Sequence, residues 1–169
     1  MESWSSRGPR PSALIHKHRA GLHHVLVSGG SAERRAAIAK AFHDQSALAA
    51  GAFVHLAAAS DGERLENALL DWLAPPPPVR AGDPLRLSSR GTLYIDGVEH
   101  LTTGGQRRLL AFVGSAERGA TGSWAGRLIA GSATALEEEV AGGRFLSSLF
   151  DTLDKVRVHL GSLVEEPRG

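Results

Sequence analysis

Short apolar runs alternate with amphipathic stretches along most of this chain, and this alternation restricts the possible folds more than any other feature. The strand-like runs are Val25–Ser28, Phe53–Ala57, Thr92–Asp96, Leu128–Ser132 and Val156–Leu160. The helix-like stretches are Ala32–Gln45, Glu63–Leu73, Gly104–Val113 and Gly143–Leu153. Strands that alternate with helices are joined by crossover connections, which produce a parallel sheet with helices on both faces. The sequence therefore predicts an α/β fold, an αβα sandwich around a central five-stranded parallel sheet.

Composition favours one globular domain and excludes several classes of function. With 169 residues, 42% of them hydrophobic, the chain is long enough to bury a sizeable core. A net charge of +1 gives no broad electrostatic footprint for nucleic acid, and the absence of cysteine excludes disulfides and thiolate metal sites. No apolar run is long enough to span a bilayer. These features fit a cytoplasmic protein. We also expect no bound metal and, from the changes in the phosphate loop described below, no cofactor.

The chain divides into three parts and has two interruptions. Residues 1–20 are expected to form a flexible N-terminal arm with a short helix at its end, residues 21–164 the α/β domain, and residues 165–169 a tail. The run Pro75, Pro76, Pro77 and Pro78 ends a helix and begins a stiff connector that reaches about Ser89. The Gly-rich segment from Ser115 to Gly126 is typical of a surface loop.

The first strand and helix are joined where nucleotide-binding folds carry their phosphate loop. That loop requires the pattern G-x-x-x-x-G-K-[ST], in which backbone N–H groups surround the phosphates and the lysine reaches them. Counted from Gly29, the second glycine position holds Arg34, the lysine position Arg35 and the hydroxyl position Ala36. A side chain at position 34 stands where the backbone must approach a phosphate closely. We interpret Gly29 and Gly30 as a tight turn rather than a phosphate cradle.

Two segments later in the chain match a known family of nucleotide-binding domains. Residues 91–96 (Gly-Thr-Leu-Tyr-Ile-Asp) read as a Walker B strand, and residues 136–145 read Leu-Glu-Glu-Glu-Val-Ala-Gly-Gly-Arg-Phe. Together with the apolar pattern that continues to Leu160, they resemble the AAA+ domain of bacterial sigma-54-dependent transcription activators. The resemblance runs from about Val25 to Leu163. It implies a P-loop NTPase fold of the AAA+ type, and the chain ends near Glu166, before the family's helical lid.

In that family a ring of subunits hydrolyses ATP to remodel a sigma-54 polymerase complex. The resemblance implies that this chain has other residues at most of the positions that hydrolysis requires. The Walker A lysine falls on Arg35, and the Walker B aspartate is retained as Asp96. The remaining family positions are the water-orienting Glu, the sensor Asn and two Arg fingers, which fall on Gly97, Ala133, Leu146 and Thr152. The Gly-Ala-Phe-Thr-Gly-Ala loop that grips sigma-54 is not found, and the tetraproline connector stands in its region.

These losses predict a catalytically inactive AAA+-like domain, not an enzyme, that acts by binding another protein in transcription or signalling control. Gly29, Arg35 and Asp96 are then vestiges of a nucleotide site. The expected partner is an AAA+ activator or an unrelated cytoplasmic regulator. The candidate contact residues are the four prolines and Trp124, which is either an interface anchor or a packed loop tryptophan. We expect a monomer or a simple dimer rather than a hexamer.

Three alternatives remain open at this stage. In the first, Arg35 and Asp96 hold ATP or ADP weakly without hydrolysing it, so that the domain is a nucleotide-binding switch. A second is residual ATPase activity, which would require other residues to have taken over every lost role. The third is direct DNA binding, for which the sequence offers neither a basic helix nor a known motif.

Overall fold

The computed structural model describes residues 10–74, 82–117, 124 and 126–161. The elements are α2 (Pro11–Lys17), β1 (Val25–Ser28), α3 (Ala32–Asp44), β2 (Phe53–Ala57), α4 (Ala58–Leu73), α5 (Pro84–Leu87), β3 (Thr92–Asp96), the 3-10 turn η1 (Val98–His100), α6 (Thr103–Glu117), β4 (Arg127–Ser132), α7 (Leu136–Ala141), α8 (Ser147–Leu153) and β5 (Val156–His159). No described helix is long and apolar enough to cross a membrane.

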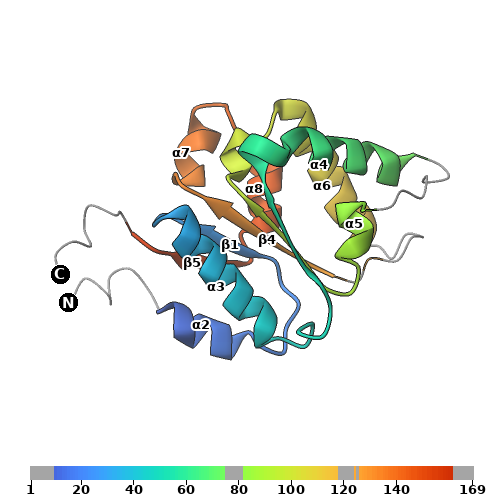
Figure 1. Ribbon diagram of the computed structural model, residues 1–169. Coiled ribbons are helices and arrows are strands. Elements are labelled where there is room, and N and C mark those ends of the chain that lie inside the picture. The colour runs from blue at the N-terminus through green and yellow to red at the C-terminus, as the bar shows by residue number, and fades with distance from the viewer. Residues whose placement is uncertain (1–9, 75–81, 118–123, 125, 162–169) are drawn as a thin grey trace.

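The strands form one parallel sheet in the order β2-β3-β4-β1-β5. This confirms the predicted five-stranded α/β architecture. Strands β1, β2 and β3 have the predicted bounds. β1 and β3 end at the polar residues Ser28 and Asp96, whereas β2, whose apolar run is interrupted by His55, leads directly into α4. Since all strands run the same way, their carboxyl ends meet at one edge of the sheet. The turn after β1 and the end of β3 lie at that edge (Figure 1).

Helices cover both faces of the sheet, as Figure 1 shows. On one face α2 and α3 pack over a cluster that includes Phe42, Tyr94 and Ile129. On the other face α4, α6 and α8 pack over a larger cluster built around Leu65, Leu109 and other aliphatic side chains. Strands β1 to β4 contribute alternate side chains to the two clusters, which is the period that a sheet covered on both faces requires. The edge strand β5 contributes Val156 and Val158 to the first cluster alone.

Two helix starts differ from the sequence prediction. The predicted helix from Gly143 to Leu153 begins only at Ser147, because Gly143 has a φ of +76° and cannot continue a right-handed helix. Its preceding residues form the separate helix α7, which was not predicted. Helix α4 begins five residues earlier than predicted, at Ala58, and Asp61 Oδ2 accepts a hydrogen bond from the N–H of Ala57 at 2.9 Å.

The N-terminal segment is attached to the domain over its described part. Helix α2 buries Leu14 and Ile15 against α3 and β5. The connection to β1 is held by Arg127, a buried residue at the start of β4, whose guanidinium donates to Gly21 O at 3.2 Å and Phe42 O at 3.4 Å. The carbonyl of Phe42 belongs to the last turn of α3, where the helix dipole favours a cation. This arginine therefore ties together three segments that are distant in sequence.

Candidate functional site

The turn between β1 and α3 is short and closed. Gly29 and Gly30 have φ values of +85° and +63°, so they form the tight left-handed turn predicted from the sequence. Ser31 caps α3 by accepting the N–H of Arg34 at 3.0 Å, and the helix begins at Ala32. Residues 32–34, which would be loop residues in a phosphate-binding pattern, are therefore the first turn of α3.

Backbone groups from neighbouring strands occupy the N–H groups of this turn. Gly29 N–H donates to Ser132 O and Gly30 N–H donates to Gly161 O, both at 2.9 Å. The backbone of Gly161 lies so close that a Cβ on Gly29 would stand 2.7 Å from its carbonyl oxygen. The glycines are thus required by close packing against the chain that follows β5. Two amides of the turn point at protein carbonyls.

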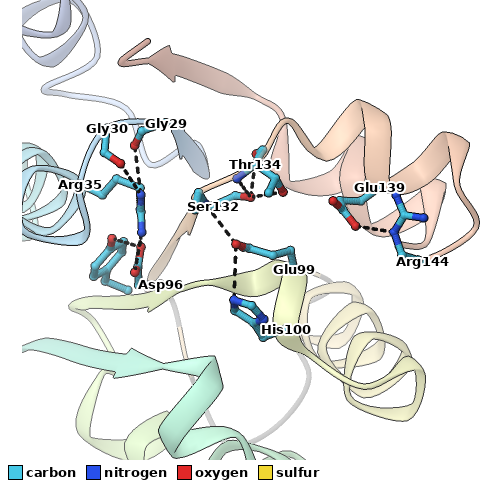
Figure 2. Close-up of polar contacts among 12 residues, drawn as sticks. Gly29, Gly30, Arg35, Asp96, Glu99, His100, Ser132, Thr134, Glu139 and Arg144 are labelled. Atoms are coloured by element: carbon cyan, nitrogen blue, oxygen red, sulfur yellow. Dashed lines mark hydrogen bonds and ion pairs between the residues drawn. The ribbon is translucent and has the colours of Figure 1, made fainter. Parts of the chain in front are cut away.

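The side chain of Arg35 lies across the mouth of the turn and pairs with Asp96 at the end of β3 (Figure 2). Its Nε donates to Asp96 Oδ1 at 2.8 Å and its Nη2 donates to Oδ2 at 3.1 Å, a bidentate ion pair. Nη1 donates to the carbonyl oxygens of Gly29 and Gly30 at 3.1 and 3.0 Å. The two charged side chains are only 6% and 12% exposed. The guanidinium therefore joins the turn after β1 to the end of β3.

Tyr94 and Gly131 make this pair possible. The hydroxyl of Tyr94 donates to Asp96 Oδ1 at 2.7 Å from within the core. Strand β4 lies between β3 and β1, and its residue Gly131 has no side chain at the crossing point. A Cβ there would collide with Asp96 Oδ1 and stand 2.6 Å from the hydroxyl oxygen of Tyr94. Glycine at position 131 thus leaves the space in which the carboxylate reaches across to Arg35.

The charges of this cluster are mutually stabilised. Burial alone would raise the pKa of Asp96, but the hydrogen bonds from Arg35 and Tyr94 outweigh it and hold the pKa below its usual value. The hydrogen bond to Asp96 raises the pKa of Arg35. Burial, followed by the hydrogen bond to Asp96, raises the pKa of Tyr94. The ion pair is therefore fully charged at neutral pH, and the tyrosine remains a donor.

Glu99 lies at the same edge of the sheet, apart from the ion pair of Arg35 and Asp96 (Figure 2). Its Oε2 accepts the N–H of Ala133 at 3.2 Å and lies 3.6 Å from Nε2 of His100, an exposed turn residue. The Glu99 side chain is 7% exposed, and its Oε1 has no hydrogen-bond partner among the described residues. This carboxylate connects η1 to the end of β4, in the region where the sequence places Ala133 at the sensor position.

A cavity of about 240 Å³ lies beside the turn. Its lining includes Ser28, Thr134 and His159, and the hydroxyl oxygen of Ser28 lies 3.2 Å from Nδ1 of His159. Ligand pockets commonly start near ~300 Å³, so this space is small for a nucleotide. No group of three His, Asp or Glu side chains in the described ranges is arranged to hold a metal ion.

The structure separates the remaining predicted site residues from this cluster. Leu146 packs against the core beside α8, and the hydroxyl of Thr152 donates to Ser148 O within α8. Trp124 is buried, stacks edge-on against Phe112 at 5.0 Å and donates from Nε1 to the hydroxyl of Ser88 at 3.3 Å. Of the two interpretations of Trp124, the structure shows the packed side chain. The prolines at 75–78 lie outside the described residues.

Sequence reasoning missed Tyr94 and Gly131. The bidentate pair itself was also missed, although both of its residues had been singled out. An isolated glycine inside an otherwise apolar strand is a known sign of close approach, and Gly131 fits that description. Nothing in the spacing of residues 35 and 96 indicates that their side chains meet, because they come from different elements.

The sheet order, the helices on both faces and the glycine turn before α3 define a P-loop NTPase domain of the AAA+ type. The family model for the sigma-54 interaction domain matches residues 59–163, which is more than half of the chain. The chain therefore belongs to the sigma-54 interaction domain family.

Several known proteins are similar to it. The nitrogen assimilation regulatory protein NtrX of Azorhizobium caulinodans is 31% identical in an alignment of 150 residues that covers 83% of this chain and 32% of that protein. NtrX from Brucella abortus, solved in complex with ATP, superimposes with a TM-score of 0.75 at 27% identity over 90% of this chain and 35% of that one. The P-loop NTPase domain of a sigma-54 transport activator from E. coli matches with a TM-score of 0.59 at 20% identity, over 89% of this chain and all of that one.

The chain spans about a third of the length of the curated relative it matches. The shared part is thus the AAA+ domain of a regulatory family.

Proposed function

We propose that this domain is a non-catalytic AAA+-like module that acts by binding another protein. The observation that carries the proposal is the position of Arg35. Its guanidinium lies over the glycine turn and makes its hydrogen bonds to Gly29, Gly30 and Asp96. In a working site the N–H groups of this turn would face the phosphates, and the aspartate would help to hold a magnesium ion. A cation of the protein itself therefore fills the place of the ligand.

The geometry of the turn supports the proposal. A phosphate needs several backbone N–H groups aimed at one point. Here the N–H groups of Gly29 and Gly30 donate to carbonyls of the sheet edge, and Ser31 accepts the N–H of Arg34. The carboxylate of Asp96 uses both oxygens on Arg35, and Tyr94 donates to one of them. The residues at this turn do not fit a nucleotide phosphate or its metal ion.

The positions that would perform hydrolysis support the proposal further. Gly97 offers no carboxylate to orient water, and Ala133 offers only its backbone, which Glu99 engages. Leu146 and Thr152 cannot place a positive charge on a neighbouring subunit's phosphate, a contact that is worth orders of magnitude in rate. Each missing group removes a separate contribution to catalysis. No described side chain at this edge replaces them all.

The regulatory role follows from the relatives. NtrX is a nitrogen assimilation regulatory protein, and this chain shares its AAA+ domain. We place the present domain in transcription or signalling control, in the cytoplasm, with a protein partner that is an AAA+ activator or another regulator. In this proposal the rigid α/β scaffold presents altered loops and does no chemical work.

Thermal melting with millimolar ATP or ADP and Mg²⁺, combined with a phosphate-release assay, tests the proposal. A ligand raises the melting temperature only if it binds the folded state more tightly than the unfolded state. At a concentration one hundred times its Kd, such a ligand adds about 2.7 kcal/mol to the free energy of unfolding. We expect an unchanged melting temperature and no phosphate release. NtrX from Brucella abortus, which was solved in complex with ATP, is the positive control for binding. An upward shift that Arg35→Ala abolishes would instead identify a nucleotide-binding switch, and released phosphate would identify an ATPase.

A further inference from the structure

The outer edge of β2 is open along the described part of the chain. Strand β2 lies at one end of the sheet and pairs only with β3. The strand is the teal segment that leads into α4 in Figure 1. An open strand edge presents unpaired N–H and C=O groups and is a template for another strand, so most proteins guard such edges. The backbone groups and side chains along the edge of β2 therefore indicate what can bind to it.

Alternation along β2 identifies the outward-facing backbone groups. Thr92 N–H donates to Ala52 O at 2.9 Å, so Ala52 turns its carbonyl toward β3. Residues one and three positions further along, Phe53 and His55, turn their N–H and C=O groups to the opposite, open side. Ala57 has the same parity, and its N–H is taken by the carboxylate of Asp61 at 2.9 Å. The open groups are thus those of Phe53 and His55.

Strand β2 and its neighbouring residues lack the charged side chains and prolines that usually prevent an edge strand from pairing. Residues 46–60 contain no Lys, Arg, Asp, Glu or Pro, although 22% of the chain is charged. His55 is the most polar side chain of β2, and Phe53 and Val54 are partly exposed. The opposite edge, β5, is different, because α2 packs against it and Arg157 forms ion pairs there with Asp154 and Glu137. The β2 edge combines open backbone groups with a strand that has no charged side chain of its own. A charge does lie nearby, since Nζ of Lys40 on α3 is 5.9 Å from the centre of the Phe53 ring, and this lysine pairs with Asp44.

We propose that two copies of this chain associate through β2, which pairs antiparallel with the β2 strand of the second copy. In the register that uses the open groups, Phe53 exchanges both backbone hydrogen bonds with the partner's His55, and His55 does so with the partner's Phe53. The twofold axis then passes beside Val54, which faces the partner's Val54 in a non-hydrogen-bonded pair. The two five-stranded sheets become one continuous sheet.

A second copy fits this edge because the edge is complementary to itself. Antiparallel pairing of a strand with its own copy is isologous, so each open donor finds an acceptor without any other sequence. The absence of charge on residues 46–60 removes like-charge repulsion between the copies. Small residues on both sides of the pair, Gly51, Ala52 and Ala57, leave room for close approach. The proposal does not depend on whether the β1 turn binds nucleotide.

The contact is small. A strand of this length buries less than the ~800 Å² per partner of a standard interface, so the dimer is weak and depends on concentration. Measurement by light scattering or sedimentation should show the mass rising from 17.8 kDa toward twice that value as the concentration increases. A mass that stays at 17.8 kDa at every concentration would overturn the proposal.

A cysteine trap tests the register, and the chain suits it because it has no cysteine of its own. Facing residues in a non-hydrogen-bonded pair have Cα atoms about 4.5 Å apart, within the range of a disulfide. Val54→Cys is therefore expected to form a covalent dimer under mild oxidation. His55→Cys is the matched control on the neighbouring residue, because its two copies are offset diagonally by about 7–8 Å and cannot bridge readily.

Equal cross-linking of Val54→Cys and His55→Cys, or none in either, would overturn the proposed register. His55→Pro tests the backbone bonds, since proline removes an N–H that faces away from β3 and is tolerated at such edge positions. This variant should keep its circular dichroism spectrum and remain a monomer at the concentrations where the unaltered chain dimerises. A folded His55→Pro variant that still dimerises would place the interface elsewhere. If the variant does not fold, the cysteine pair alone decides.

Discussion

Removal of the Arg35 side-chain charge is expected to destabilise the domain even when no ligand is present. Arg35→Met keeps the aliphatic length but leaves Asp96 as a buried carboxylate without its cation. Breaking a buried ion pair by removing one partner costs about 3–5 kcal/mol. For a domain of this size 1 kcal/mol corresponds to about 2–4 °C, so the melting temperature should fall by roughly 6–20 °C.

This prediction separates a structural pair from a ligand-binding residue. A side chain held ready for a phosphate would cost little on removal in the absence of nucleotide, because its hydrogen bonds would be made to the ligand. The guanidinium of Arg35 instead donates its four hydrogen bonds to protein atoms, two of them to the carbonyls of the β1 turn. Chemical denaturation of the unaltered chain and of Arg35→Met, in buffer without nucleotide, measures the difference. The matched control is Arg107→Met, an exposed arginine on α6.

A double-mutant cycle isolates the pair itself. Asp96→Asn removes the carboxylate charge, so the double variant Arg35→Met/Asp96→Asn no longer buries an unpaired charge. It should therefore be more stable than Arg35→Met alone, with a coupling energy of about 0.5–3 kcal/mol. A single variant that melts within the range of Arg107→Met, or two single effects that simply add, would refute the reasoning.

Four further predictions test other contacts of the site and of the core. Gly131→Ala should cost about 2 kcal/mol or more, measured by denaturation, because its Cβ displaces Asp96 and Tyr94. Tyr94→Phe should cost about 1.5–3 kcal/mol, since it removes a hydrogen bond to a charged group; no loss of stability would contradict the bond. Trp124→Ala should cost about 3–5 kcal/mol, as for a core aromatic, whereas a value near zero would restore its interpretation as an exposed anchor. Burial lowers the pKa of His43, whose ring nitrogens contact the hydroxyl of Thr92 and the carbonyl of Gly51. The neutral ring stabilises the fold above about pH 6.5, so the melting temperature should fall as the pH drops below that value, and His43→Gln should flatten the slope.

Much of the fold could be predicted from the sequence because its elements are local. The bounds of β1, β2 and β3 follow from short runs of mainly apolar residues. The family resemblance added the topology, and the family model and the solved structures confirm it. The helix start at Ser147 could not be read in this way. The apolar period continues through Gly143, but residues 142–146 separate α7 from α8, among them Gly143 with a positive φ and Leu146 with an extended backbone.

The contents of the site depend on contacts between distant segments. In the sequence comparison, Arg35 stands at the position of the Walker A lysine and keeps its positive charge, and Asp96 stands at the position of the Walker B aspartate. That they neutralise each other depends on Gly131, on a strand between them, having no side chain. It also depends on arginine being long and forked, so that one guanidinium reaches both the carboxylate and two carbonyls. A family pattern compares each position separately, so it does not reveal the ion pair between residues 35 and 96.

The central claim is that the side chain of Arg35 occupies the place of a nucleotide phosphate. Calorimetric titration of the purified chain with ATP and Mg²⁺ tests it most directly, with NtrX from Brucella abortus as the binding control. The account predicts heats no larger than dilution for this chain under conditions in which the control saturates. A saturable binding curve that disappears in Asp96→Asn would contradict it.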